Sequence, residues 1–192
     1  MTEKKISRRD AMKILGAAIG AAALANLPSK WDKPELAQGV LPAHAQQSVA
    51  VAAPVCLAAV GNVALKKMAN QSSTEGAGFE AIKAVDGSVF SRWASSHIGG
   101  AKNPEWMYVD LDDNYNISRV TIRWEAAYAE SYQVEVSNDA VNWNAVANVV
   151  GGKGGVVDHA FATGCWRYVR VYCTLRTGLN DGFSLYEIEV YG

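Results

Sequence analysis

The stretch Trp106-Met107-Tyr108-Val109-Asp110-Leu111 places an aliphatic side chain at every second position. Successive side chains of a β-strand point to opposite faces, so this period of two predicts a strand with one face in a core. The same alternation recurs at 120–125, 132–137, 168–173 and 185–191. Several strands that each have one apolar face bury those faces most simply as two stacked sheets. The sequence therefore predicts an all-β sandwich.

Turn-forming residues separate the alternating segments. Clusters of Asp, Asn, Ser and Gly favour tight turns because they tolerate unusual backbone angles or hydrogen-bond their own backbone. They occur at 112–114, 137–139, 151–155 and 180–182. The only helical pattern is Phe79 to Ala84, about one and a half turns. This succession of strands and turns predicts one domain over residues 60–192.

The N-terminus has the pattern of an export signal. Ser7, Arg8, Arg9 and Lys13 precede an apolar run at 14–24, which is shorter and less hydrophobic than the roughly 20 residues that a transmembrane helix needs. Paired arginines before a mild Gly/Ala-rich run resemble a bacterial twin-arginine signal, although Ala11 and Met12 depart from its usual Phe and Leu. The alternative, an amphipathic helix docked on the domain, is disfavoured because the run has no polar face.

The cleavage pattern Ala43-His44-Ala45 predicts a signal peptide over 1–45. A linker rich in Ala, Val and Ser follows at 46–59. We therefore expect an exported protein, periplasmic or extracellular, whose mature domain does not insert into a membrane.

The three cysteines are expected to be small buried or half-buried thiols. Cys165 and Cys173 lie at the two ends of one predicted strand, about 26 Å apart in extended chain, which is too far for a disulfide. Pairing of Cys56 with either of them stays open.

Composition and motifs disfavour nucleic-acid binding and catalysis. The formal net charge is -1, which gives no long-range attraction to nucleic acid or to an anionic membrane. There is no G-x-S-x-G motif and no His/Cys cluster of metal-binding spacing. The alternative is a glycosidase in which Glu75 and Glu125 act as the acid and the base. A single domain, however, has no second domain with which to form a substrate cleft. We expect no enzyme activity.

A series of short motifs, in a particular order, carries a family resemblance. They are Asn62 to Leu65, Ala84 to Gly87, Arg92 to Ser95, Trp106 to Leu111, Tyr132 to Asp139 with Trp143, Arg167 to Val171, and Tyr186 to Gly192. Together they resemble the coagulation factor 5/8 type C, or discoidin, domain, and are most similar to bacterial carbohydrate-binding modules of family 32. Segments 72–75, 123–129 and 176–184 resemble the modules appended to chitosanases and β-glucanases.

The resemblance implies an eight-stranded jelly roll that binds carbohydrate without catalysis through loops at one end. The ligand would be a terminal sugar of a glucan, a chitosan-like or a galactose-containing glycan, and a protein partner could supply catalysis or avidity. The alternative is a discoidin-type adhesion module that binds protein or lipid through hydrophobic spikes. Only Ile98 and Leu179 are obvious spikes in the polar loops.

The resemblance also implies one structural calcium ion. Calcium takes six to eight oxygen ligands. The family pattern assigns it the side chains of Asp86 and Glu187, the Ser91 hydroxyl, and carbonyls near Ala84, Ser88 and Ser91. The alternative is an Asx-turn at Asp86 and a surface position for Glu187.

The family pattern places four candidate sugar-binding residues at one end of the sandwich: Glu75, Arg92, His97 and Glu125. Arg92 offers a planar fork for adjacent hydroxyls, and the two carboxylates accept hydroxyl protons and attract a protonated amino sugar. His97 stands where the chitosan-binding relatives are aromatic, which keeps galactose open as a ligand. The alternative is that Arg92 and a glutamate form an ordinary surface ion pair.

The tryptophans on predicted strands are expected in the core or on a sandwich face rather than as sugar platforms. They are Trp93, Trp106, Trp124, Trp143 and Trp166.

Overall fold

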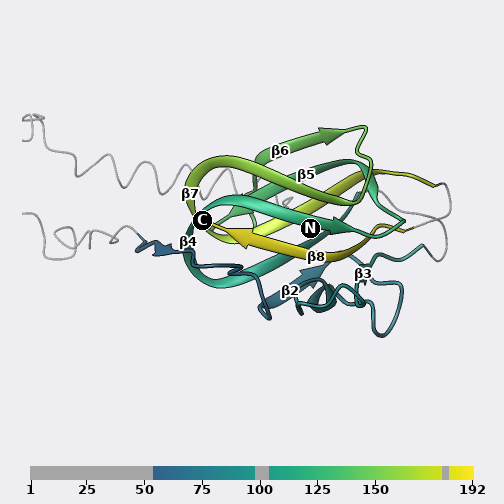
Figure 1. The fold of residues 1–192 in the computed structure, drawn as a ribbon, viewed down its shortest axis with the longest axis horizontal. Coiled ribbons are helices and arrows are strands. Elements are labelled where there is room, and N and C mark those ends of the chain that lie inside the picture. Colours follow the sequence, from purple (N-terminus) through teal and green to yellow (C-terminus); the bar gives the residue numbers. More distant parts are fainter. Residues whose placement is uncertain (1–53, 98–103, 179–181) are drawn as a thin grey trace, which may run out of the picture. The chain divides into compact units, whose positions relative to one another are not determined.

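The computed structural model of the protein describes residues 54–97, 104–178 and 182–192 (Figure 1). The predicted signal peptide and most of the predicted linker lie outside these residues. Within the described part, no helix is long and apolar enough to cross a membrane. The strands are β1 (Leu57–Ala58), β2 (Met68–Gln71), β3 (Trp93–Ala94), β4 (Glu105–Trp124), β5 (Ala129–Ser137), β6 (Asn144–Val150), β7 (Val156–Arg176) and β8 (Ser184–Tyr191). A short 3-10 helix, η2 (Ala81–Ala84), lies within the segment with the helical pattern.

Two long strands, β4 and β7, run through both layers of a β-sandwich and curl over at one end (Figure 1). The first half of β4 pairs with β2 and with the second half of β7, which continues to β5 and β6. The second half of β4 pairs with β8 and with the first half of β7, and β8 pairs with β3. The predicted all-β sandwich is confirmed.

One predicted boundary between strands is wrong. Residues 112–114 were expected to separate two strands, but they form a bend within β4, where the pairing with β7 shifts register between Asp110 and Tyr115. Asp112 takes a left-handed φ of 71° at this bend, a conformation that Asp tolerates better than most residues. The bend carries β4 from one layer into the other.

The core is formed by the side chains that the alternation assigned to it. Met107, Val109 and Leu111 have no exposed surface, and neither do Val120 and Ile122. Burying a side chain of this size stabilises the fold by about 1.5–3 kcal/mol. Trp93 and Trp124 also lie in the core, whereas Trp106, Trp143 and Trp166 are half-buried.

A disulfide joins Cys56 to Cys165, with the two Cα atoms 5.7 Å apart. Free thiols were expected at both positions, and that expectation is wrong; Cys173 is a buried free thiol as expected. Next to the disulfide, β1 pairs in parallel with Tyr115 and Asn116 of β4. The described end of the predicted linker is therefore attached to the sandwich by a covalent bond and by strand pairing.

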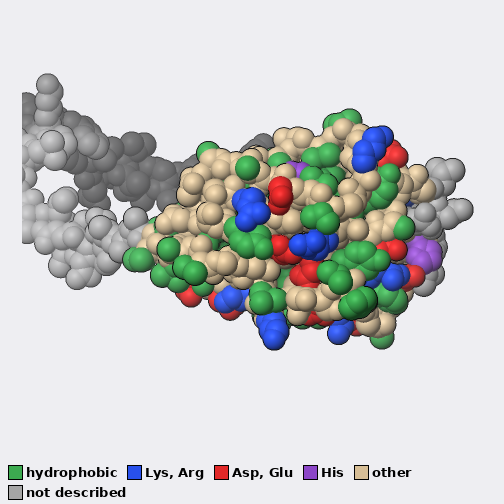
Figure 2. Space-filling model, viewed as in Figure 1, with side chains coloured by type: hydrophobic (Ala, Val, Ile, Leu, Met, Phe, Trp, Pro, Cys, Tyr) green, Lys and Arg blue, Asp and Glu red, His purple; other side chains and the backbone are tan. Residues whose placement is uncertain are grey.

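The face of the domain shown in Figure 2 carries basic and acidic side chains in alternation rather than in a single-sign patch. This mixed surface agrees with the net charge of -1.

Candidate functional site

A pocket of about 310 Å³ lies at the end of the sandwich opposite the bend in β4. Four segments wall it: the turn after β2, the chain around β3, the β4–β5 connection and the start of β8. Glu75, Arg92, His97 and Glu125, the four candidates from the sequence, all line this one pocket. The remaining lining residues are Ala94, Ser95, Ala126, Ala127, Gly182, Phe183 and Ser184.

The small residues of the lining let backbone segments approach one another. Gly182 packs on the carbonyl oxygen of Ser95, and a Cβ at this position would collide with it. The Ser95 N–H donates to the Phe183 carbonyl at 2.8 Å, and the Phe183 N–H donates to the Ser95 hydroxyl at 2.8 Å. The pocket floor is thus a hydrogen-bonded junction between β3 and β8.

Arg92 is held by an aromatic ring more than by an acid. Its guanidinium carbon lies 4.5 Å from the centroid of the Phe79 ring, a cation–π geometry. Its Nη2 is 3.5 Å from a Glu75 carboxylate oxygen, and its Nε is buried with no hydrogen-bond partner among the described residues. A pair this long is not a tight fork-to-carboxylate clamp, so hydrogen-bonding capacity remains on both side chains.

Glu75 and His97 face each other across the pocket. The other carboxylate oxygen of Glu75 is 4.0 Å from His97 Nδ1, and His97 is exposed. The backbone of Glu75 is anchored because its N–H donates to the Ala94 carbonyl at 2.8 Å. Glu75 therefore sits between a cation and an imidazole without a short bond to either.

Glu125 is positioned by its own loop. One carboxylate oxygen accepts the Ala127 N–H at 2.9 Å. The Glu125 N–H donates to the Ser184 carbonyl at 3.1 Å, and the Ser184 N–H donates to the Ala127 carbonyl at 2.8 Å. No basic side chain pairs with Glu125 among the described residues.

A buried carboxylate behind the pocket was missed in the sequence. Glu105 is only 3% exposed and accepts hydrogen bonds from the hydroxyls of Ser72 and Ser73, the latter at 2.9 Å. The Ser73 hydroxyl also accepts the Ser96 N–H at 3.0 Å. Glu105 thus ties together the two loops that carry Glu75 and His97. Its signal in the sequence is a carboxylate at an inward position, in register with Met107 and Val109.

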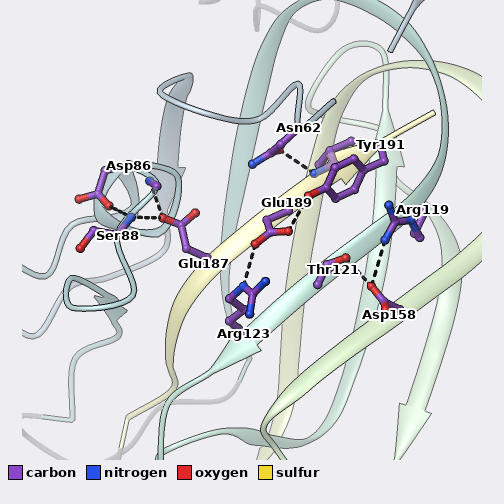
Figure 3. Close-up of polar contacts among 12 residues, drawn as sticks. Asn62, Asp86, Ser88, Arg119, Thr121, Arg123, Asp158, Glu187, Glu189 and Tyr191 are labelled. Atoms are coloured by element: carbon purple, nitrogen blue, oxygen red, sulfur yellow. Dashed lines mark hydrogen bonds and ion pairs between the residues drawn. The ribbon is translucent and has the colours of Figure 1, made fainter. Parts of the chain in front are cut away.

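Four of the predicted calcium-ligand residues, Asp86, Ser88, Ser91 and Glu187, are joined by hydrogen bonds where the 86–91 loop meets β8; Figure 3 shows Asp86, Ser88 and Glu187. One Glu187 oxygen accepts the N–H groups of Gly87 at 2.6 Å and Ser88 at 2.9 Å. The Ser91 hydroxyl donates to both oxygens of Asp86, at 2.9 and 2.8 Å. The Ser88 N–H also bonds Asp86 at 2.9 Å, so the Asx-turn alternative is present at Asp86.

Glu187 is not a surface residue, because it is only 3% exposed. Its second oxygen is buried with no partner among the described residues. The pKa of Glu187 is raised to about 7, mainly by burial, with a smaller contribution from the neighbouring Asp86 charge. Glu189, two residues along β8, has its carboxylate bound by Arg123 at 2.7 Å and by the Tyr191 hydroxyl at 2.6 Å (Figure 3).

This oxygen set fits a hard cation, since calcium accepts hydroxyl and carbonyl oxygens beside carboxylates. The 86–91 loop supplies one carboxylate, Asp86, and β8 supplies the other, Glu187. The described residues contain no cluster of three or more His, Cys, Asp or Glu suited to a metal. Ala84, whose carbonyl is the remaining predicted ligand, is the last residue of η2 and lies two residues before Asp86.

Known proteins share this fold and much of this sequence. A family model described as a NedA-like, galactose-binding domain of F5/8 type C matches residues 83–171. Chitosan-binding module 1 of a chitosanase/glucanase from Paenibacillus sp. IK-5 is 47% identical, covering 68% of this chain and 98% of the module, with a TM-score of 0.64. The chain belongs to the F5/8 type C family of galactose-binding domains.

Two further solved structures extend the comparison. Chitosan-binding module 2 of the same enzyme, solved with chitotriose, is 44% identical over 68% of this chain and all of the module, with a TM-score of 0.64. A Clostridium perfringens family 32 module, solved with GalNAc-β-1,3-galactose, is 18% identical over 69% of this chain and all of the module, with a TM-score of 0.62, and shares the fold. No curated protein matches the chain.

The adhesion alternative depended on Ile98 and Leu179, and both lie outside the described residues. The glycosidase alternative depended on Glu75 and Glu125, which line the same pocket. The relatives of this F5/8 type C domain with the highest identities above are binding modules.

Proposed function

We propose that this domain binds carbohydrate without catalysis, in the pocket formed by Glu75, Arg92, His97 and Glu125. The observation that carries the proposal is the convergence of these four side chains, from separate loops, in one pocket of a domain 44–47% identical to chitosan-binding modules. Sugar sites combine a few placed polar groups with apolar surface. Here the accessible apolar surface comes from Ala126 and Ala127, because Ala94 and Phe183 are buried beneath the pocket.

The charge of the pocket favours an amino sugar. Two carboxylates and one guanidinium line the pocket, and Glu125 has no ion pair with a basic side chain among the described residues. A protonated glucosamine unit would supply the missing positive charge, and Arg92 would hold adjacent hydroxyls. We therefore propose a chitosan-like glycan as the ligand class, with galactose-containing glycans as the competing class.

Calorimetric titration of residues 46–192 tests this proposal. Glucosamine oligosaccharides should bind with a Kd of about 0.1–1 mM, since a single shallow pocket buries few atoms. Glu125→Gln should weaken that binding about tenfold, because it removes the free charge while keeping the shape. Glu130→Gln, outside the pocket, is the matched control. Absence of heat with every sugar of a broad panel would refute the proposal, and release of reducing sugar would show catalysis instead.

We also propose that the 86–91 loop and Glu187 hold a structural calcium ion. Asp86, Glu187 and the Ser91 hydroxyl, with the carbonyls of Ala84, Ser88 and Ser91, would be its ligands. The buried, unpartnered oxygen of Glu187 supports this, because such an atom lacks compensation for its lost hydration. A bound cation would supply that compensation and stabilise the loop against β8.

Chelation is the direct test of the metal. Removing calcium from the wild-type domain should lower Tm by several degrees, and adding calcium should restore it. Glu187→Gln should melt at the same temperature with and without calcium. Wild-type melting curves that are identical after thorough chelation would exclude the ion.

We propose that the protein is exported. The Cys56–Cys165 disulfide supports an oxidising compartment, and the Arg8-Arg9 pattern supports the twin-arginine route. Cell fractionation should find the protein outside the cytoplasm, and Arg8→Lys with Arg9→Lys should retain it there. N-terminal sequencing of the exported form tests cleavage after Ala45.

A further inference from the structure

The outer face of one layer carries an aromatic cluster that the first pocket does not use. Trp106 and Tyr108 point outward from β4, and Tyr168 and Tyr172 point outward from β7, all half-buried. The ring of Tyr108 contacts three others, with centroids 5.6 Å from Trp106, 5.6 Å from Trp143 and 6.0 Å from Tyr168. The strand alternation alone accounts for their outward position, but not for their number on one face.

A second pocket, of about 200 Å³, opens beside this cluster and is named here the outer groove. The Tyr108 and Tyr168 rings meet at 85° and form a corner of the groove. Met68, which is 69% exposed, lines the groove too. The remaining lining residues are Ala69, Asn70, Asp110 and Ala140.

Polar groups in the outer groove are already held in position. Arg167 binds Asp110 through two parallel hydrogen bonds of 2.8 and 2.9 Å, and this contact lowers the pKa of Asp110. The Asn70 side-chain amide donates to the Tyr108 hydroxyl at 3.2 Å. Side chains fixed in this way lose little conformational entropy when a ligand binds.

The outer groove is separate from the first pocket. Met68 pairs with Asp110 near the bend of β4, whereas Gln71 pairs with Met107 at the other end of β2. The chain continues from Gln71 to Glu75 of the first pocket. No lining residue is shared between the two pockets.

We propose that the outer groove is a second carbohydrate-binding subsite, for an uncharged pyranose unit. Two aromatic rings offer apolar surface to the C–H face of a sugar, and the carboxylate and amide beside them accept and donate to hydroxyls. The Asp110 charge is neutralised by Arg167, so the groove does not select a cation as the first pocket does. We infer a pyranose as the ligand because the outer groove combines aromatic rings with groups that bind hydroxyls.

Two subsites on one domain would change how it holds a polysaccharide. A glycan chain bound at one subsite presents further units to the other at high effective concentration. Weak single contacts would then add to useful retention on an insoluble polymer, without a second domain.

Nitrogen-15 NMR titration of the Arg92→Ala/Glu125→Ala protein tests the outer groove with the first pocket disabled. The probe is the uncharged N-acetylglucosamine hexasaccharide. Backbone amides of 68–70, 108–111 and 167–169 should shift in a saturable way. Tyr168→Ala in this background should weaken the interaction about tenfold or more.

Tyr172→Ala is the matched control, since Tyr172 also points outward from β7 beneath an arginine but lies outside the groove. The Arg170 guanidinium is 5.0 Å from its ring, and the Arg167 guanidinium is 5.1 Å from Tyr168. Thermal melting confirms that both variants fold. The proposal is overturned if the groove amides do not shift, or if the two tyrosine variants lose the interaction equally. Because the first pocket is disabled, this result is independent of whether that pocket binds sugar.

Discussion

At the residue scale, Arg92 depends on the shape of its side chain as well as its charge. The guanidinium rests on Phe79, and its one side-chain contact with an acid among the described residues is the 3.5 Å one from Nη2 to Glu75. Arg92→Lys keeps the charge but loses the planar fork and the stacking. We expect glucosamine oligosaccharides to bind about tenfold more weakly by calorimetry. Arg119→Lys, distant from the pocket, should bind as wild type, and an unchanged Kd for Arg92→Lys would show that charge alone matters.

Also at this scale, His159 makes stability depend on pH. It is 9% exposed and lies 3.1 Å from the Tyr132 hydroxyl. Burial lowers the pKa of His159 below 6.5. Below pH 6.5 the unfolded chain takes up the proton more readily than the folded domain, so the free energy of unfolding falls as the pH drops through the folded pKa.

Urea unfolding at pH 7.5 and at pH 5 measures how much His159 lowers the free energy of unfolding on acidification. The loss of stability on acidification should be smaller in His159→Gln than in wild type. The comparison between variants is needed because Glu187, whose pKa is raised to about 7, acts in the opposite direction over the same range. If both proteins lose the same free energy of unfolding, His159 does not contribute to the pH dependence.

At the element scale, Glu105 is a positioning residue for the pocket. It anchors the 72–75 loop, which in turn holds Ser96. Glu105→Ala leaves the two serine hydroxyls without their acceptor and should lower both Tm and glycan affinity. Glu105→Gln retains an acceptor oxygen and should recover part of the affinity. If Glu105→Ala lowers Tm but leaves Kd unchanged, the residue serves stability alone.

The elements themselves were largely predictable. Alternation identified the inward side chains of β4, β5, β7 and β8, because the period of two is a local property of extended backbone. It did not reveal that 112–114 would bend a strand instead of ending it. That outcome depends on the partner strand, since Tyr115 and Asn116 resume pairing with Trp166 and Cys165.

At the scale of the whole molecule, the Cys56–Cys165 disulfide closes most of the domain into one loop. The two cysteines are 109 residues apart, and cross-links of this span restrict the unfolded chain strongly. Cys56→Ser with Cys165→Ser should lower the free energy of unfolding by about 2–5 kcal/mol. Urea unfolding measures it, with the buried thiol Cys173 left intact in both proteins. A loss below about 1 kcal/mol would mean that β1 pairing holds this end without the bond.

The sequence by itself determined the fold class, the inward face of each strand and the residue types of the candidate sites, because periodicity and motif order are carried by near neighbours. Only the tertiary structure decided that Cys56 pairs with Cys165, that Glu105 ties two loops, and that Tyr108, Asp110 and Tyr168 share a groove with Met68. Each of these joins positions far apart in the chain. Such contacts depend on how sheets bend and pair, and no local pattern records that geometry.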